Sequence, residues 1–200
     1  MMQLRFWKST WKMQTPEIYA CRADCDKETF DKMLSYVRDD KRERILNQKN
    51  AVSACEMLAG ELLMMYAVRD SFCVSPKNVQ FYKNKYGKLY LKNVDNAYFN
   101  ISHSGGAAIC AVFEREIGAD IQKISRYNPS LAQKMCNEEE LDYLNSSDNK
   151  DYAFSLLWCK KEAYHKLLGT GISYPNFAKS YDCSFKFYDI FDMVAAVAWR

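Results

Sequence analysis

A histidine flanked by two serines stands just ahead of a pair of glycines in this 200-residue chain. The five residues are Ser102, His103, Ser104, Gly105 and Gly106, and we expect them to form a turn between two strands. Such a turn can direct backbone N–H groups and side-chain donors at a phosphate. The alternative is a polar turn in which the serine hydroxyls cap the turn's own backbone.

Two polar residues, Asp120 and Gln122, alternate with apolar ones in the sequence Gly-Ala-Asp-Ile-Gln that begins at Gly118. Because side chains two positions apart on a strand point to the same side, Asp120 and Gln122 share one face. A carboxylate and an amide oxygen on one face are ligands that suit a hard cation such as Mg²⁺. A polar strand edge that faces solvent would show the same pattern.

Glu162 and Lys166 are four residues apart in the sequence Trp-Cys-Lys-Lys-Glu-Ala-Tyr-His-Lys, which begins at Trp158. A helix places the two residues on one face, about 6 Å apart along its axis. The simpler interpretation is a surface ion pair that contributes a few tenths of a kcal/mol. The other is a carboxylate that binds a metal or takes a proton, beside an ammonium that neutralises a leaving phosphate.

The elements that must position these residues alternate between strand and helix. Helices are predicted at 39–68 with a break near 47–50, from 138 onward, and at 152–168, where Gly169 stops the helix. Strands are predicted at 18–23, 81–83, 89–91, 98–101, 107–113, 117–121, 184–188 and 193–199. Each half follows the order strand, helix, strand, strand, with a helix expected to end at Gly60 or Gly169. The pattern predicts two similar α+β halves.

Composition and charge narrow the class of protein. Apolar residues make up 48% of the chain and charged residues 26%, a balance that excludes disorder, collagen and coiled coil. The net charge of +3 is too small to predict non-specific nucleic-acid binding. The eight cysteines include no C-x-x-C pair, which predicts reduced, mostly buried thiols rather than a zinc site or a disulfide framework.

In order and spacing, these stretches resemble the 4'-phosphopantetheinyl transferases, specifically the long, two-lobed class that activates peptide synthetases such as surfactin synthetase. The family pattern has Gly-Lys-Pro, Asn-x-Ser-His-Ser, Gly-(Ile/Val)-Asp-(Ile/Val)-Glu and Trp-(Ser/Cys)-x-Lys-Glu-(Ala/Ser)-x-x-Lys. This chain has Gly87-Lys88-Leu89, Asn100-Ile-Ser102-His103-Ser104, Gly118-Ala-Asp120-Ile-Gln122 and Trp158-Cys-Lys-Lys161-Glu162-Ala163-Tyr-His-Lys166. The resemblance runs from about residue 18 to the last strand, and the fourth motif is the most specific.

The resemblance implies an α+β, pseudo-dimeric fold of two similar lobes, each with a small, mostly antiparallel sheet packed on a long helix. Residues 1–114 would form the N-terminal lobe on the coenzyme A side, and residues 115–200 the C-terminal lobe on the metal and carrier-protein side. The implied activity is Mg²⁺-dependent transfer of the 4'-phosphopantetheine arm of coenzyme A to a serine of an apo carrier protein. Adenosine 3',5'-bisphosphate would be released.

The resemblance also implies roles for the matching residues. Asp120, Gln122 and Glu162 would hold Mg²⁺ against the pyrophosphate, and Glu162 would also remove the proton of the attacking serine. Lys166 would stabilise the departing phosphate, and Lys161 would support the pyrophosphate or the helix. The other implied contacts with coenzyme A are Ser102 and His103 at its phosphates, Gly87 and Lys88 along the adenine, and Lys41 and Arg44 facing the 3'-phosphate. We take Asp120, His103, Glu162 and Lys166 as the catalytic set, because phosphoryl-type transfer needs positioning and charge neutralisation.

The chain departs from the family pattern at three places. Gln122 stands where many relatives have a third carboxylate, which predicts weaker affinity for Mg²⁺. Leu89 replaces a proline, which should loosen the loop on the adenine side. Glu56 lies where relatives usually carry an arginine, and often a threonine, near the 3'-phosphate, so it would repel that phosphate if it points inward. If Glu56 faces solvent instead, the 3'-phosphate would be contacted by Lys41, Arg44 or Lys49.

Two other functions remain open. The departures at Gln122 and Glu56 would suit a non-catalytic family member that binds coenzyme A or a carrier protein. A hydrolase built on Ser102, His103 and Asp120 is disfavoured, because adjacent residues of an extended segment point to opposite faces.

Partners and location follow from the same sequence. The family resemblance implies that the carrier protein docks on the second lobe near residues 124–144. One chain supplies both lobes, so a monomer is expected. The chain has no run of 18 uninterrupted apolar residues and its first residues lack an apolar signal core, which predicts no membrane partner and a cytoplasmic location.

Overall fold

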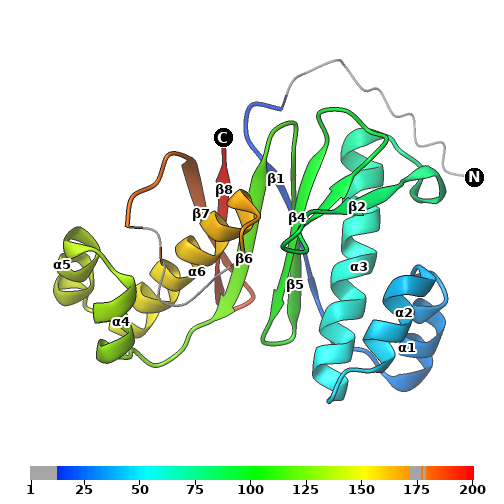
Figure 1. Ribbon diagram of the computed structural model, residues 1–200. Coiled ribbons are helices and arrows are strands. Elements are labelled where there is room, and N and C mark those ends of the chain that lie inside the picture. The colour runs from blue at the N-terminus through cyan, green and yellow to red at the C-terminus, as the bar shows by residue number, and fades with distance from the viewer. Residues whose placement is uncertain (1–12, 172–176, 178) are drawn as a thin grey trace, which may run out of the picture.

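The computed structural model describes residues 13–171, 177 and 179–200, so the first residues, on which the absence of a signal segment was predicted, lie outside it. Figure 1 shows two lobes with strands of both in the middle. The elements in chain order are β1 (Glu17–Arg22), α1 (Lys27–Leu34), α2 (Asp39–Leu46), α3 (Ala51–Phe72), η1 (Pro76–Asn78), β2 (Phe81–Lys83), β3 (Leu89–Leu91), β4 (Tyr98–Ser104), β5 (Ala107–Phe113), β6 (Ile117–Lys123), α4 (Pro129–Met135), α5 (Glu138–Ser146), α6 (Lys150–Leu168), β7 (Ser184–Ile190) and β8 (Met193–Trp199).

The two lobes are built on one topology. Each has a three-stranded antiparallel sheet, with the order β1-β5-β4 in the first lobe and β6-β8-β7 in the second. In both sheets the last strand in sequence lies in the centre, between the first strand and its hairpin partner. The predicted α+β fold of two similar lobes is therefore confirmed.

Four layers stack across the molecule because the central strands are apolar on both faces. Odd-numbered residues of β5 and β8 meet in the seam between the two sheets, together with Ile117, Ala119 and Ile121 of β6. Even-numbered residues face outward, those of β5 onto α3 and those of β8 onto α6. A strand buried on both faces reads as a continuous apolar run, which is how residues 107–113 and 193–199 appear in the sequence. Packing of the two sheets on each other brings β4 of the first lobe against β6 of the second.

The long N-terminal helical stretch is interrupted as predicted. Asn50 caps α3 by accepting a hydrogen bond from the Ser53 backbone N–H at 2.8 Å. The prediction that this helix ends at Gly60 is wrong, because α3 continues to pack on β4 and β5 and reaches Phe72. Gly60 lies inside the helix, where an added Cβ would be 3.8 Å from the His103 ring. The short helix α1, which the sequence reading missed, is capped by Asp26.

Helix α3 is also the one helix in the described part of the chain that is long and apolar enough to cross a membrane, with 22 residues and a mean hydropathy of 1.4 over its most apolar window. This result depends on length and composition alone, and the mostly buried core helix of a soluble protein passes the same test. In the structure one side of α3 packs on β4 and β5, and two of its glutamates are buried.

The β4–β5 connection is tighter than the sequence predicted. β4 continues through Ser104, which pairs with Ala107 on β5. Only Gly105 and Gly106 form the turn, with φ of +58° and +80°, and a two-residue hairpin turn of this kind favours glycine at both positions. The prediction of a turn over residues 102–106 is therefore wrong. Because Ser102 is part of a strand, its side chain and that of its neighbour point to opposite faces.

Candidate active site

Asp120 lies at the centre of a polar cluster at the edge of this seam, where β4, β6 and α6 meet. It is on β6 and faces α6, with a side chain only 2% exposed, so a solvent-facing strand edge is excluded for this residue. Its Oδ1 accepts hydrogen bonds from Ser102 Oγ at 2.7 Å and from Lys166 Nζ at 2.6 Å. Lys166 also donates to Ser102 at 2.8 Å. The three sequence motifs on β4, β6 and α6 thus meet at one point.

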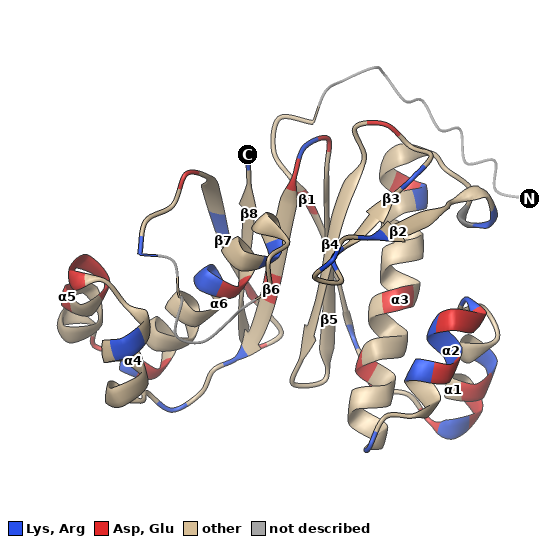
Figure 2. Cartoon of the chain, in the orientation of Figure 1, with Lys and Arg blue, Asp and Glu red and all other residues tan. Residues whose placement is uncertain are grey.

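Close packing of α6 on β6 makes this meeting possible. A Cβ added to Gly118 would lie 2.1 Å from the Ala163 carbonyl oxygen, so only glycine fits there. Figure 2 shows acidic and basic residues of α6 beside the acidic residue of β6. The alternative of a surface ion pair between Glu162 and Lys166 is wrong, because Lys166 forms its ion pair with Asp120.

Glu162 is the second carboxylate of the cluster. Burial, and next the charge of Asp120, raise the pKa of Glu162 to about 6, while Lys166 opposes the shift. Burial is the larger cause of this shift, and the nearby Asp120 carboxylate adds to it. Asp120 and Glu162 are close enough for their charges to interact.

Gln122 completes the set on β6. Its Nε2 donates to Asp120 Oδ2 at 3.1 Å, so Gln122 and Asp120 share a face as predicted from the strand alternation. This contact turns the amide N–H₂ group toward the carboxylate and leaves the amide oxygen for another partner.

A pocket of about 260 Å³ opens beside this cluster, between the lobes. Glu162 and Lys166 line it from α6, and Gly87 lines it from the β2–β3 hairpin. Its other lining residues, most of which the sequence reading did not single out, are Tyr86, Lys88, Asn100, Ile101, His165, Gly169 and Gly171. The pocket joins the predicted adenine-side residues to the predicted catalytic residues.

Lys88 directs its ammonium group away from solvent. Nζ donates to Glu116 Oε2 at 2.8 Å, to the Ile117 carbonyl at 3.1 Å and to the Leu167 carbonyl at 2.8 Å. Burial lowers the pKa of Lys88, and the pair with Glu116 offsets part of that effect. Since all three N–H donors of the ammonium have protein partners, Lys88 ties the β2–β3 hairpin to the second lobe.

Two asparagines that the sequence reading did not assign a role also join the lobes. Asn84 Nδ2 donates to the Gly169 carbonyl at 2.8 Å, at the end of α6. Asn100 Oδ1 accepts from the Ala119 backbone N–H at 2.9 Å, between β4 and β6. Asn100 stood inside the Asn-x-Ser-His-Ser motif, whereas nothing in the local sequence distinguishes Asn84.

Lys161, one of the predicted ligands of the pyrophosphate, is fully buried away from the pocket. Its Nζ donates to Glu140 Oε2 at 2.7 Å and to the Tyr181 hydroxyl at 2.9 Å. Of the two roles predicted for Lys161, the structure favours support of the helix, because this ion pair holds α5 against α6.

The two basic residues predicted at the 3'-phosphate are on α2. Lys41 is buried and forms an ion pair with Glu61 of α3. Arg44 is exposed. Neither lines the pocket between the lobes, so the structure does not bring them to the other site residues.

Glu56 points inward, which decides the question that the sequence left open. Its Oε1 accepts the Gly106 backbone N–H at 2.7 Å, and its Oε2 lies 3.4 Å from His103 Nδ1. His103 therefore faces α3, on the opposite side of β4 from Ser102. This opposition removes the arrangement that a Ser102–His103–Asp120 hydrolase would need.

The donor set at the seam fits a hard divalent ion. Mg²⁺ binds one or two carboxylates and completes its shell with phosphate oxygens and waters. Asp120 and Glu162 supply two carboxylates whose mutual repulsion a cation would relieve, and Gln122 supplies an amide oxygen. In the described residues no three acidic, histidine or cysteine side chains gather into a metal-binding group, so any ion here would also depend on oxygens from a substrate.

Comparison with known proteins gives one family for both lobes. Residues 24–115 match a family described as 4'-phosphopantetheinyl transferase, N-terminal, and residues 116–197 match the 4'-phosphopantetheinyl transferase superfamily. Similar proteins include a 4'-phosphopantetheinyl transferase of Bacillus subtilis, 31% identical over 72% of this chain and 66% of the relative. The 4'-phosphopantetheinyl transferase gsp of Aneurinibacillus migulanus is 30% identical over 76% of this chain and 64% of the relative. The 4'-phosphopantetheinyl transferase ffp of Bacillus subtilis is 31% identical over 79% and 71%. The aligned part therefore spans about two thirds of the length of these relatives.

Proposed function

Because the chain belongs to the 4'-phosphopantetheinyl transferase superfamily, we propose that it moves the 4'-phosphopantetheine arm of coenzyme A onto a serine of an apo carrier protein. The observation that supports this most directly is the convergence of Asp120, Glu162 and Lys166 beside one pocket between the lobes. Two acids and an ammonium at a cleft are the groups that transfer of a phosphate-linked arm requires.

Asp120, Glu162 and the amide oxygen of Gln122 would hold Mg²⁺ in this proposal. When bound, such an ion neutralises charge on the pyrophosphate of coenzyme A. The cavity beside these residues has a volume of about 260 Å³, and Gly87 lies at its other side, where the adenine would extend.

The chemical step is a displacement at phosphorus. The serine hydroxyl oxygen forms a bond to the phosphorus that carries the pantetheine arm, and the bond from that phosphorus to the bridging oxygen breaks. The serine proton passes to a carboxylate oxygen of Glu162, which lines the pocket. The electron pair of the broken bond leaves with adenosine 3',5'-bisphosphate, and Lys166 stabilises the charge that develops there.

The remaining properties form part of the same proposal. The carrier protein would dock on the second lobe near residues 124–144, where Ile124 and Tyr143 are 39% and 44% exposed. The enzyme would act as a monomer, because its two lobes already form the cleft within one chain. A cytoplasmic location without membrane or nucleic-acid partners stays part of the proposal.

Mass spectrometry tests the transfer itself. The protein is incubated with coenzyme A, Mg²⁺ and an apo acyl or peptidyl carrier protein, and the carrier should gain the mass of a phosphopantetheine arm. The variant Asp120→Asn should abolish the gain, whereas the exposed Asp148→Asn should leave it unchanged. A carrier that keeps its apo mass with every carrier class tried would contradict the proposal.

A second function is favoured by one observation, the inward position of Glu56 beside His103. A carboxylate there would weaken the binding of a phosphate and would suit a non-catalytic member that binds coenzyme A or a carrier. Binding of the carrier by calorimetry together with no gain in its mass would support this alternative over the transferase.

A further inference from the structure

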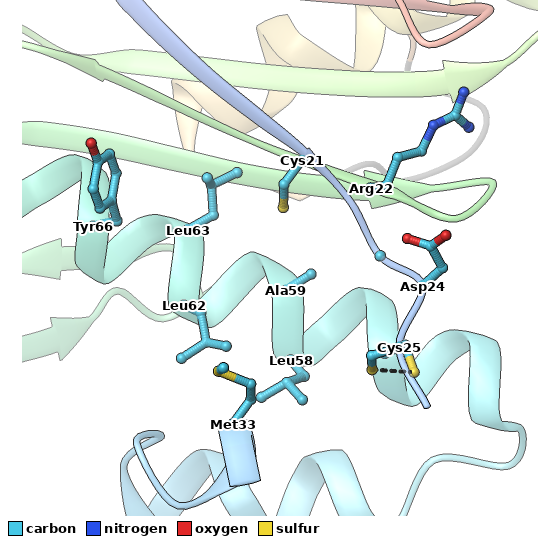
Figure 3. A pocket seen from close by; sticks show the side chains of 12 residues that line it. Cys21, Arg22, Asp24, Cys25, Met33, Leu58, Ala59, Leu62, Leu63 and Tyr66 are labelled. Atoms are coloured by element: carbon cyan, nitrogen blue, oxygen red, sulfur yellow. Dashed lines mark hydrogen bonds between the residues drawn. The ribbon is translucent and has the colours of Figure 1, made fainter. Parts of the chain in front are cut away.

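Two cysteines lie in contact outside the site described above. Cys25 Sγ and Cys55 Sγ are 3.2 Å apart, and Figure 3 shows the contact at one end of a pocket along α3. Cys25 belongs to the connection between β1 and α1, just before the cap residue Asp26. Cys55 is near the start of α3. The two thiols therefore bridge segments that are 30 residues apart in sequence.

Small molecules can reach this pair. Both cysteines are partly exposed, and both line the pocket, which has a volume of about 310 Å³. The rest of its lining is largely apolar and includes Met33, Leu58 and Leu62. The pocket is wide enough for a small uncharged oxidant to approach the sulfurs.

Each cysteine stands close in sequence to a residue that holds the β4–β5 turn. The Ala23 backbone N–H, two residues before Cys25, donates to the Gly106 carbonyl at 2.8 Å. Glu56, the neighbour of Cys55, accepts the Gly106 N–H at 2.7 Å. The segments that carry the two thiols thus each form a hydrogen bond with Gly106 in the turn.

We propose that Cys25 and Cys55 form an oxidation site, which a hydroperoxide converts into an intramolecular disulfide. The disulfide would fix the two segments that form hydrogen bonds with Gly106. One thiol is oxidised by the peroxide to a sulfenic acid, and the peroxide O–O bond breaks with release of water or an alcohol. The other thiol then attacks that sulfur, so the S–S bond forms, the S–O bond breaks and one water molecule leaves. The two sulfurs close from 3.2 Å to about 2.05 Å.

Oxidation should be slow at neutral pH. Burial, and next the neighbouring Cys55 and the acidic residues Asp26 and Asp24, raise the pKa of Cys25 to about 11. The thiolate is the reactive form, so the pair stays reduced under brief exposure and reacts faster at pH 9 than at pH 7.

Peptide mapping of the whole protein tests the site. After treatment with hydrogen peroxide and blocking of free thiols, the unreduced digest should contain a peptide that links Cys25 to Cys55, with the loss of two hydrogens. Hydrogen–deuterium exchange at residues 104–107 should slow several-fold in the oxidised protein and recover after reduction with dithiothreitol.

Serine variants supply the controls. Cys25→Ser and Cys55→Ser should each remove the linked peptide and the slower exchange, whereas Cys73→Ser, at an exposed thiol, should retain both. A link from Cys21 to either residue, or oxidation of both thiols to sulfinic acids without a link, would overturn the assignment. Unchanged exchange at the turn in a protein that does contain the disulfide would overturn its proposed effect on Gly106.

Discussion

Lys166 on α6 lies 2.6 Å from Asp120 on β6, and its ammonium also reaches Ser102 of the other lobe at 2.8 Å. Residues 46 and 64 positions apart in sequence thus share one charged hydrogen-bond cluster across the seam. The geometry places a positive charge in the lining of the pocket between the lobes and a buried negative charge next to it. This relationship underlies the predictions that follow.

The variant Lys166→Met tests the importance of the ammonium. Loss of the partner leaves a carboxylate that is 2% exposed without its counter-charge, which costs about 3 kcal/mol when a buried pair is broken. We expect a free energy of unfolding lower by about that amount in urea titrations, and transfer slower by at least about a hundredfold. Lys150→Met, at an exposed position on the same helix, should change neither quantity.

The variant Glu162→Gln should raise stability in alkaline solution while it abolishes transfer. The pKa of Glu162 rises from its ordinary 4.5 in the unfolded chain to about 6 in the folded protein. The folded state therefore holds the proton more tightly, and stability falls as the pH rises from about 4.5 to above 6. After a discount for solvent screening, the loss is roughly 1 kcal/mol.

Urea titrations at two pH values check this prediction. The glutamine variant should match the parent at pH 4.5 and exceed it at pH 8, and the exposed Glu43→Gln should show no such divergence. A variant that is less stable than the parent at pH 8 would contradict the repulsion inferred between Glu162 and Asp120.

The variant Gln122→Glu should strengthen metal binding. A third carboxylate beside Asp120 adds a full negative charge to the proposed ligand set. The concentration of Mg²⁺ that gives half-maximal transfer should therefore fall by about tenfold relative to the parent. An unchanged metal requirement would show that this side chain does not take part in binding the ion.

The variant Glu56→Gln should lower the KM for coenzyme A by about threefold to tenfold, because it removes a negative charge beside His103, a residue expected to contact a phosphate. The amide oxygen can still accept the Gly106 N–H, so the turn should persist. Steady-state kinetics with varied coenzyme A measure the effect, and Glu28→Gln, an equal charge change on the exposed face of α1, is the control. A higher KM in Glu56→Gln would mean that the carboxylate orients His103 for binding.

Local patterns in the sequence predicted the parts of the fold that depend on periodicity and capping. The apolar runs of β5 and β8, the break before α3 and the start of α5 at Glu138 follow from the residues themselves. The length of the β4–β5 turn did not, because the three polar residues before Gly105 suit a turn as well as a strand. Cross-strand pairing with β5 decided between them.

The partners of buried charges could not be predicted in the same way. Lys41, Lys88 and Lys161 each pair with a glutamate that is 20 to 28 residues away in sequence. No local spacing identifies such a partner, since it is set by the packing of separate elements. The motif on α6 therefore predicted which residue types matter, whereas the fold decided that Lys166 faces the seam and Lys161 faces α5.

Binding of Mn²⁺, followed by electron paramagnetic resonance in the presence of coenzyme A, tests most directly whether Asp120 and Glu162 share one divalent ion. The parent protein should bind one ion per chain, and Asp120→Asn and Glu162→Gln should each weaken that binding by more than about thirtyfold. If either variant binds Mn²⁺ as tightly as the parent, the two carboxylates do not form a common metal site.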